Sequence, residues 1–221
     1  MLFFIPVIAA CVLSSCATVP SMVQWPVQRE TIGRPPIGSQ EVEQQEVVRV
    51  KIVEYAESLL GREDLELING WFRNDCSGYV LGVYRTLGYR VRLTPNSSTR
   101  EISLLLHQVL SRDGFIYTST VPKIADVVFF KGTIDPRVNK VSHVGIVSDI
   151  NRDGTVRILN YTSKGVTVLH MNLSTPGVHI NENGDIKNDF LRKKLSSSDS
   201  VKLLSGELFC CFGDLLAHCL Q

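Results

Sequence analysis

One cysteine and one histidine stand where a thiol hydrolase needs its nucleophile and its base. Cys76 lies directly before an apolar helical pattern, within Asn74-Asp75-Cys76-Ser77-Gly78, and His143 lies directly before the apolar run Val144-Gly145-Ile146-Val147. A thiol attacks as the thiolate, and a helix N-terminus lowers the thiol pKa through unpaired N–H groups and the helix dipole. Histidine can take the proton and return it to the leaving group. The pair predicts nucleophilic catalysis by Cys76 with His143 as base.

The elements that must position this pair follow from the hydrophobic periodicity. Helical spacing predicts three helices: one from Glu41 to Gly61, one that begins at Cys76 with Asn74 or Asp75 as N-cap, and one that begins with a capping box at Ser98. After Pro122, β-branched and aromatic runs predict strands over residues 127–130, 144–147, 156–159 and 166–169. Helices followed by antiparallel strands predict an α+β domain. Residues 208–212 fit either a last strand or a buried helical turn.

The two motifs closely resemble those of a known enzyme family. Asp75-Cys76-Ser77-Gly78 followed by His143-Val144-Gly145-Ile146 is similar to the NlpC-type family of papain-like cell-wall endopeptidases, over roughly residues 46–170. The resemblance implies a papain-like α+β fold with N-terminal helices packed on an antiparallel sheet. It also implies that Asn160, on the strand after His143, orients the imidazole, although an ordinary strand-end role for Asn160 stays open. His170, at a strand end, is the alternative base.

Further roles come only from the resemblance. Asp75 and Ser77 are expected to receive the free amine of a stem peptide, with helix capping as the equal alternative. Asp126 matches a family element in which Ala125 replaces Gly, and it is expected to fix a loop. The family usually carries Tyr-x-Trp-Gly-Gly before the cysteine, whereas this chain has no tyrosine between Tyr55 and Tyr79. Trp71 is therefore the expected aromatic lining of the cleft.

The N-terminal residues predict export and a lipid anchor. Residues 2–13 are apolar but shorter than the ~20 residues of a membrane-spanning helix, and they run into Leu13-Ser14-Ser15-Cys16, which looks like a bacterial lipobox. We expect a signal peptide over residues 1–15, lipidation at Cys16, and a cell-envelope protein held in the outer membrane and facing the periplasm. The alternatives are a plain secretory leader and a second lipobox at Cys11. A signal peptide usually opens with a basic residue, and the first here is Arg29, which leaves open whether translation begins upstream.

Composition and the positions of the cysteines limit the remaining possibilities for domain organisation, partners and metal binding. Residues 16–40 hold four prolines and little periodicity, which predicts a tether, and residues 41–221 form the catalytic domain. The net charge of +1 in 221 residues, with no basic run, speaks against a nucleic-acid partner. Cys210, Cys211 and Cys219 are expected to be buried free thiols, with a disulfide to Cys219 as the alternative. No metal or cofactor is expected, because only His218 lies near these cysteines in the sequence.

These observations together predict a lipid-anchored cysteine endopeptidase that binds peptidoglycan stem peptides and hydrolyses an amide bond in them. One rival is an acyl transferase or amidase on the same scaffold, favoured by the missing tyrosine motif and the membrane anchor. The other is a catalytically idle wall-binding lipoprotein, against which intact Cys76 and His143 argue.

Overall fold

The computed structural model describes residues 37–93, 101–135, 137–192 and 202–221, with side chains from residue 42 onward. Residues 37–221 belong to one compact unit. The predicted signal peptide, Cys16 and nearly all of the predicted tether therefore lie outside the described residues. The last residues assigned to the tether, 37–40, belong to the first helix. No helix in the described ranges has the length and apolar character that crossing a bilayer requires.

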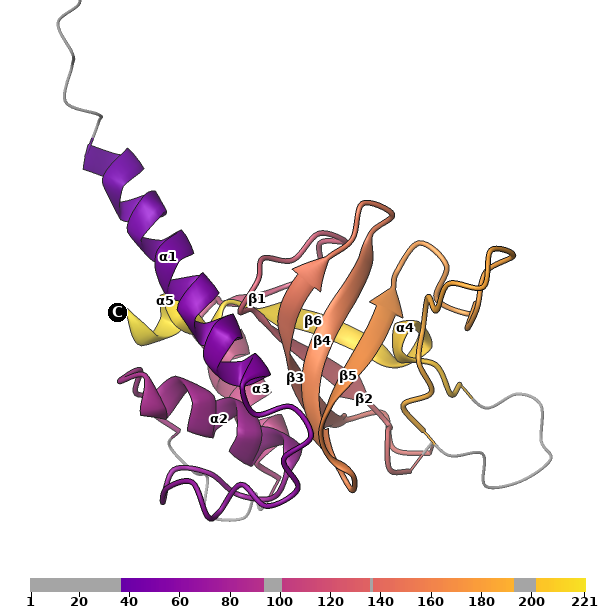
Figure 1. The fold of residues 1–221 in the computed structure, drawn as a ribbon, viewed down its shortest axis with the longest axis horizontal. Coiled ribbons are helices and arrows are strands. Elements are labelled where there is room, and N and C mark those ends of the chain that lie inside the picture. The colour runs from indigo at the N-terminus through magenta and orange to yellow at the C-terminus, as the bar shows by residue number, and fades with distance from the viewer. Residues whose placement is uncertain (1–36, 94–100, 136, 193–201) are drawn as a thin grey trace, which may run out of the picture. The chain divides into compact units, whose positions relative to one another are not determined.

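Helices come first along the chain and strands second, as the sequence predicts (Figure 1). The elements in order are α1 (Ile37–Glu57), α2 (Cys76–Thr86), α3 (Ile102–Arg112), β1 (Ile116–Tyr117), β2 (Val127–Lys131), β3 (Val141–Ile150), β4 (Thr155–Thr162), β5 (Gly165–Asn172), α4 (Ser205–Leu208), β6 (Phe209–Gly213) and α5 (Leu215–Cys219).

The strands form one six-stranded antiparallel sheet in the order β1-β6-β2-β3-β4-β5. Tight turns join β3 to β4 and β4 to β5, and Gly154 and Gly165 adopt the positive φ that these turns need (80° and 85°). Both turns match the glycine positions in the sequence. The α+β class, with N-terminal helices on an antiparallel sheet, is confirmed.

The sheet separates two apolar clusters. The three long helices α1, α2 and α3 cover one face, where Ile52, Tyr79 and Leu106 pack on Phe129 and Ile146. The other face carries a second cluster that includes Val128, Phe130, Ile158 and the side chains of Leu208 and Phe212. Alternate residues of β2 therefore enter different clusters, as the twofold period of a strand requires. Because both faces are covered, β2 is apolar at four successive positions.

A buried ion cluster fixes α1 to the end of the sheet. Arg49 is 1% exposed, and its guanidinium donates to Asp126 (2.8 Å), Asp214 (2.7 Å) and the carbonyl of Ile124 (2.9 Å). Asp126 also accepts from the backbone N–H of Lys123 at 2.8 Å. The carboxylate thus has a structural environment of the kind expected from the sequence.

Ala125 has a left-handed backbone, with φ of 63°. This position is the one where the resembled family carries Gly, and a side chain in this conformation costs about 1–2 kcal/mol. Ala125 is fully buried, and its carbonyl accepts a hydrogen bond from Tyr84 of α2. The strained turn is therefore held by packing and by this contact with the helix that carries Cys76.

The boundaries of two helices differ from the sequence prediction. Helix α1 begins at Ile37 and ends at Glu57, whereas Glu41 and Gly61 were the expected limits. Helix α3 begins at Ile102 with Glu101 as N-cap, and Glu101 makes no side-chain capping hydrogen bond. The expected capping box at Ser98 is therefore not the start of the helix; residues 98–100 lie outside the described ranges. Both differences are at helix ends, where apolar spacing is least informative.

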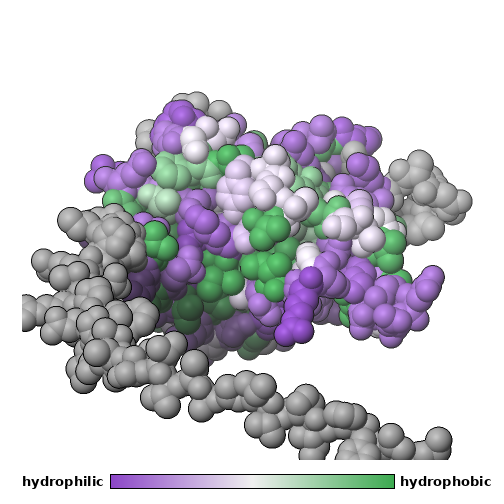
Figure 2. Space-filling view, turned by 90° about the horizontal axis from the view of Figure 1, so that it is seen from above, coloured by the Kyte–Doolittle hydropathy of each residue, from purple (hydrophilic) through white to green (hydrophobic). Residues whose placement is uncertain are grey.

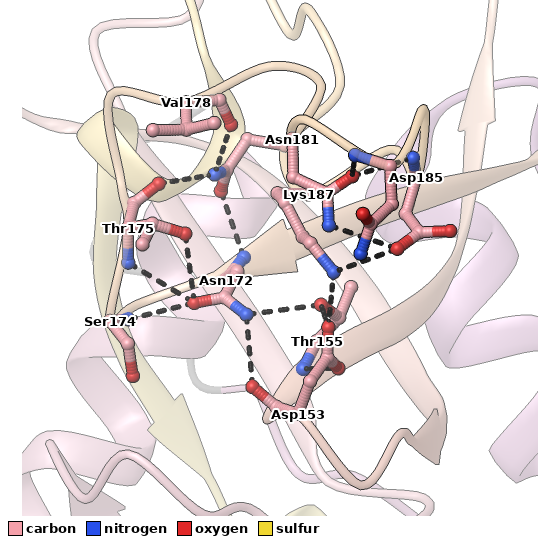
Figure 3. A network of polar contacts seen from close by, with 11 residues as sticks. Asp153, Thr155, Asn172, Ser174, Thr175, Val178, Asn181, Asp185 and Lys187 are labelled. Carbon is pink, nitrogen blue, oxygen red and sulfur yellow. Dashed lines mark hydrogen bonds and ion pairs between the residues drawn. The ribbon is translucent and has the colours of Figure 1, made fainter.

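The C-terminal region combines the two alternatives for residues 208–212. Helix α4 ends at Leu208 and β6 begins at Phe209, so a helical turn runs straight into a strand. Before it, residues 173–189 are bound to β4 and β5 by a polar network (Figure 3). Asn172 donates to the Asp153 carbonyl (3.2 Å) and the Thr155 hydroxyl (3.0 Å) and accepts from the Thr175 N–H (3.1 Å). Lys187 bridges Asp153 and Asp185.

The surface mixes polar and apolar side chains. Figure 2 shows hydrophobic residues on one face between hydrophilic ones, without a large region of a single kind. Large apolar residues that stay exposed include Leu67, Trp71, Ile134 and Phe190. Scattered exposure of this kind is ordinary for a folded domain.

Candidate active site

Helix α2 begins at the candidate nucleophile, as the sequence predicts. Asp75 has extended backbone angles and is the N-cap, and its carboxylate accepts from the N–H of Gly78 at 2.7 Å and from the Ser77 hydroxyl at 2.5 Å. Cys76 is therefore the first residue of the helix. A side chain at Gly78 would come within 2.6 Å of the Arg73 backbone carbonyl, so only glycine lets the preceding loop pack against this turn.

The strand that carries His143 lies directly beside this helix start. The backbone N–H of Val144, the residue after His143, points at the Cys76 sulfur, as do the N–H groups of Ser77 and of Cys76 itself. Gly145 permits close packing of β3 on β4, because a Cβ there would meet Ile158 at 2.6 Å. The fold therefore brings the two sequence motifs together at one end of α2.

His143 is held by a series of hydrogen bonds from β4 and β5. Asn160 is 1% exposed, and its Oδ1 lies 3.1 Å from His143 Nε2. The Asn160 amide nitrogen donates to the Thr167 carbonyl at 3.2 Å, which fixes Oδ1 as the atom that faces the ring. Nε2 must then carry the proton, and Nδ1 is the nitrogen left to accept one. Asn160 thus lies where an orienting residue is needed.

Burial shifts the pKa values of Cys76 and His143 so that the neutral form of each side chain is favoured. It raises the pKa of the Cys76 thiol to about 11, although the three N–H groups around Sγ favour the thiolate. It also lowers the pKa of His143 to about 4, against the hydrogen bond to Asn160, which favours the charged ring. At neutral pH the resting pair is a thiol and a neutral imidazole. The N–H groups at the helix start lower the thiol pKa as expected, but burial acts in the opposite direction and is the larger effect.

No hydrogen bond joins Cys76 Sγ to the His143 ring within the described residues. Catalytic hydrogen bonds in ligand-free enzymes are often long and tighten only with substrate bound. The contact of Sγ with the Val144 N–H still places the thiol one residue from the candidate base along β3.

Asp75 has charged as well as capping contacts. Arg73 donates to it through Nε at 3.0 Å, and the Arg73 guanidinium also reaches the Ser77 hydroxyl at 3.2 Å. Although partial burial opposes it, the hydrogen bonds from Ser77, Gly78 and Arg73 lower the pKa of Asp75 below its usual value. The carboxylate is therefore ionised, and its side chain is 46% exposed.

Trp71 lies toward the other end of α2. Its ring is 54% exposed and is covered by the Arg85 guanidinium, 5.9 Å from the ring centroid. Arg85 follows Cys76 by nine residues, which is about 14 Å along a helix axis. This position does not place the indole beside the nucleophile, because the loop before α2 runs along the helix before it reaches Asp75.

The other histidines have separate surroundings. His170, the alternative base, lies on β5 and contacts Asp189 through Nδ1 at 2.9 Å. His218 contacts Asp113 at 3.1 Å. His107, on α3, lies beside Cys210. Of the described histidines, His143 is the one next to the start of α2.

Three participants were not singled out from the sequence. Thr167 faces Asn160 across the β4–β5 pair, and the Val144 N–H contacts the Cys76 sulfur. Arg73 forms an ion pair with Asp75. Thr167 had a detectable signal, because the Lys164-Gly165 turn fixes which residues pair across the hairpin. The roles of Val144 and Arg73 depend on a backbone direction and a loop path that no residue type specifies.

Comparison with known proteins gives a match to a family model and matches to solved structures. No curated protein matches the chain. A solved structure that matches is an N-acetylmuramoyl-L-alanine amidase from Staphylococcus aureus, with 21% identity and a TM-score of 0.33, over 45% of this chain and 27% of that one. This chain therefore spans about a quarter of the length of that protein. Residues 68–162, somewhat less than half of the chain, match the family model of the CHAP domain. The segment that contains Cys76, His143 and Asn160 is thus similar to the CHAP domain.

Proposed function

We propose that this protein is a cysteine peptidase that hydrolyses amide bonds in peptidoglycan stem peptides. Cys76 is the nucleophile, His143 the general base and Asn160 the orienting residue. The observation that carries the proposal is the hydrogen-bonded series from the Thr167 carbonyl through Asn160 to His143 Nε2, beside a cysteine at the first position of α2. The CHAP match over residues 68–162 supports a hydrolase of the cell wall.

The neutral resting pair indicates that proton transfer accompanies attack. His143 Nδ1 takes the thiol proton while Sγ bonds to the substrate carbonyl carbon, which forms a tetrahedral intermediate and an imidazolium. The Asn160 oxygen, already bonded to Nε2–H, stabilises that imidazolium. The Cys76 N–H stabilises the oxyanion. The imidazolium gives its proton to the leaving amine, and water then hydrolyses the thioester.

Asp75 supports a stem peptide with a free amine as the substrate. Its carboxylate is ionised, half-exposed and adjacent to the nucleophile. Arg73 is its partner in an exposed ion pair, and such pairs contribute only about 0–1 kcal/mol, so a substrate ammonium can displace the guanidinium. Ser77 presents its hydroxyl to the same carboxylate and shares this subsite. Trp71 is left out of the subsite because of its position along α2.

The substrate proposal is tested by Asp75→Asn, because asparagine also caps helices and the change removes mainly the charge. The variant is expected to raise KM about tenfold for a stem peptide with a free amine. For the same peptide with its amine acetylated, the variant and the unaltered enzyme are expected to have equal KM. An equal rise for both peptides would show that Asp75 acts only as a cap.

The reaction is tested by mass spectrometry of muropeptides before and after digestion of purified sacculi. A peptidase produces shortened stem peptides with new amino termini. An amidase would release whole stem peptides from the sugar, and a transferase would add mass to an acceptor without new amino termini. Either of the last two results would contradict the peptidase proposal while leaving Cys76 as nucleophile.

We also propose that Cys16 carries a lipid that holds the enzyme at the envelope membrane, in the outer membrane facing the periplasm. The support is the apolar stretch that ends in Leu13-Ser14-Ser15-Cys16. Acylation anchors a protein by burying methylene groups, at about 0.8 kcal/mol each, without a spanning helix. The expected product begins at Cys16 with a mass increment, and Cys16→Ala loses the increment. An unmodified Cys16 in the mature protein would refute the anchor and leave the catalytic proposal untouched.

A further inference from the structure

A second group of side chains, which could bind a soft metal ion, lies on α3 and β6, whereas Cys76 and His143 lie on α2 and β3. His107 of α3 and the adjacent Cys210 and Cys211 of β6 place one nitrogen and two sulfur atoms within 4.8 Å of one another. The Cys210 and Cys211 sulfurs are 3.4 Å apart, and Cys210 Sγ lies 3.9 Å from His107 Nε2. Two sulfurs bound tetrahedrally to one zinc at ~2.3 Å would be separated by about 3.7 Å. The three atoms therefore already have nearly the spacing of metal ligands.

A β-bulge brings the two cysteines to the same side of β6. Neighbouring residues in a regular strand point to opposite faces. Here Phe129 pairs with Cys211 and Phe130 pairs with Phe209, which leaves Cys210 unpaired in the ladder between β2 and β6. Such an extra residue re-aims a side chain. The bulge turns Cys210 toward Cys211, which is buried in the helix-covered cluster.

His107 presents one ring nitrogen to the cysteines. Its Nε2 faces Cys210 Sγ and is the atom available to a cation, whereas its Nδ1 is buried and finds no hydrogen-bond partner in the described part of the chain. Its ring packs edge-on against Phe129 at a centroid distance of 5.3 Å. His107 and Cys210 are both partly exposed, so a cation could enter between α3 and β6.

The two sulfur atoms suit a thiophilic cation. Cysteine binds a metal as the thiolate, so binding displaces thiol protons and leaves negative charge beside the ion. The Cys211 thiol already donates a hydrogen bond to the Cys210 sulfur, so the two sulfur atoms face one another.

We propose that His107, Cys210 and Cys211 bind one thiophilic d¹⁰ cation, Zn²⁺ or Cu⁺, which links α3 to β6. Thiolate and imidazole ligands select these ions over hard cations. His107 lies 103 residues before Cys210. From the sequence alone, His218 is therefore the histidine expected near these cysteines. The role is structural, and the site is separate from Cys76.

The test uses the full chain with Cys76→Ser, so that the candidate nucleophile does not bind metal. The reduced, chelator-treated protein is dialysed against Zn²⁺, and the bound metal is measured. We expect about one zinc per chain and a rise in Tm of about 5–10 °C at a hundredfold excess over Kd. Co²⁺ in place of Zn²⁺ is expected to give a thiolate-to-cobalt absorption band. A second titration measures Cu⁺ against a chromogenic chelator.

Matched variants locate the site. Cys210→Ser together with Cys211→Ser is expected to abolish binding, whereas Cys219→Ser retains it. If the double variant does not fold, His107→Gln is expected to weaken the affinity at least tenfold while the cobalt band persists. Retention of Zn²⁺ or of Cu⁺ by these criteria supports the proposal and identifies the cation. Binding of neither ion, or binding unchanged in both the double variant and His107→Gln, would overturn it.

Discussion

Cys76 and Cys210 are both partly exposed. Cys76 lies beside β3, which carries His143, and Cys210 lies beside α3, which carries His107. The two cysteines differ in the groups that surround the sulfur atom. Cys76 begins a helix, and burial raises its pKa to about 11 despite three backbone N–H groups. Cys210 lies in a β-bulge, and a thiol donor lowers its pKa to about 4. The cysteine in the hydrolase motif is therefore the protonated one at rest. At Cys210 the surrounding groups act in the opposite direction and favour the thiolate.

The difference shows that ionisation and catalytic position are separate properties. A low thiol pKa suits a metal ligand, because the metal binds the thiolate and the proton is then easily displaced. A nucleophile needs its charge only as the bond forms, and a base with one free nitrogen is sufficient for that. The hydrogen-bonded His143 provides such a base, whereas His107 Nδ1 has no hydrogen-bond partner within the described ranges.

The largest effect is expected for Cys76→Ser. A hydroxyl at this position lacks the nucleophilicity of sulfur while changing little volume, so kcat/KM for peptidoglycan fragments should fall by at least about 10⁴-fold. Cys219→Ser, at a half-buried free thiol of α5, should change it by less than about twofold. Circular dichroism should show the same fold in both variants. Substantial activity in Cys76→Ser would exclude the thiol mechanism.

The next effect concerns the base. His143→Ala should lower kcat by about 10²–10⁴-fold, and Asn160→Ala by a smaller factor, because it loses orientation but keeps the imidazole. Activity of the unaltered enzyme should also decline as the pH falls through about 4, where His143 becomes protonated and can no longer accept the thiol proton. His170→Ala is the matched control. If that control were inactive and His143→Ala active, the base would be His170.

Gly78→Ala should perturb the Cys76 region alone. A Cβ there would lie 2.6 Å from the Arg73 carbonyl, so the loop before α2 must shift, at a cost of about 1–3 kcal/mol in the free energy of unfolding. Denaturant unfolding measures this loss. Gly70→Ala, where no atom lies within 4 Å of the added Cβ, is the control. The metal content of the Gly78→Ala variant should be unchanged, since α2 does not contribute to the His107 cluster.

The two thiols should differ about tenfold in alkylation rate. In metal-free protein at pH 7, hydrogen bonding favours the thiolate of Cys210 and burial favours the thiol of Cys76. The higher thiolate fraction of Cys210 should outweigh the lower intrinsic nucleophilicity that accompanies its lower pKa. Mass spectrometry after brief treatment with iodoacetamide measures both sites. Raising the pH toward 11 should reverse the order, because Cys76 then ionises. Faster labelling of Cys76 at pH 7 would indicate a preformed thiolate there.

The smallest effect is expected at Ala125, just before β2, the strand that lies between β6 and β3 in the sheet. Ala125→Gly removes the left-handed strain before β2, while it adds freedom to the unfolded chain, so the net change should lie between zero and about 1 kcal/mol of stabilisation. Thermal unfolding measures it. A clear destabilisation would mean that the packing of the Ala125 methyl group outweighs the strain.

Residue types and spacing alone predicted the parts of this protein that depend on local rules. The caps and glycines of α2, the alternation of the strands and the turns at Gly154 and Gly165 are short-range features, so the α+β class and the position of Cys76 at a helix start follow from them. The helix starts at Ile37 and Ile102 were missed, because apolar spacing does not mark where a helix begins. The order β1-β6-β2-β3-β4-β5 depends on pairing between distant segments.

The tertiary structure decided everything that depends on burial and on long-range contact. It placed Thr167 behind Asn160 and the Val144 N–H on the Cys76 sulfur, and it made the resting pair neutral. It also brought His107 to Cys210, which no spacing in the chain indicates. A side chain's pKa and its partners are set by groups far away in sequence, so a motif identifies the residue types available for chemistry while packing determines their charge.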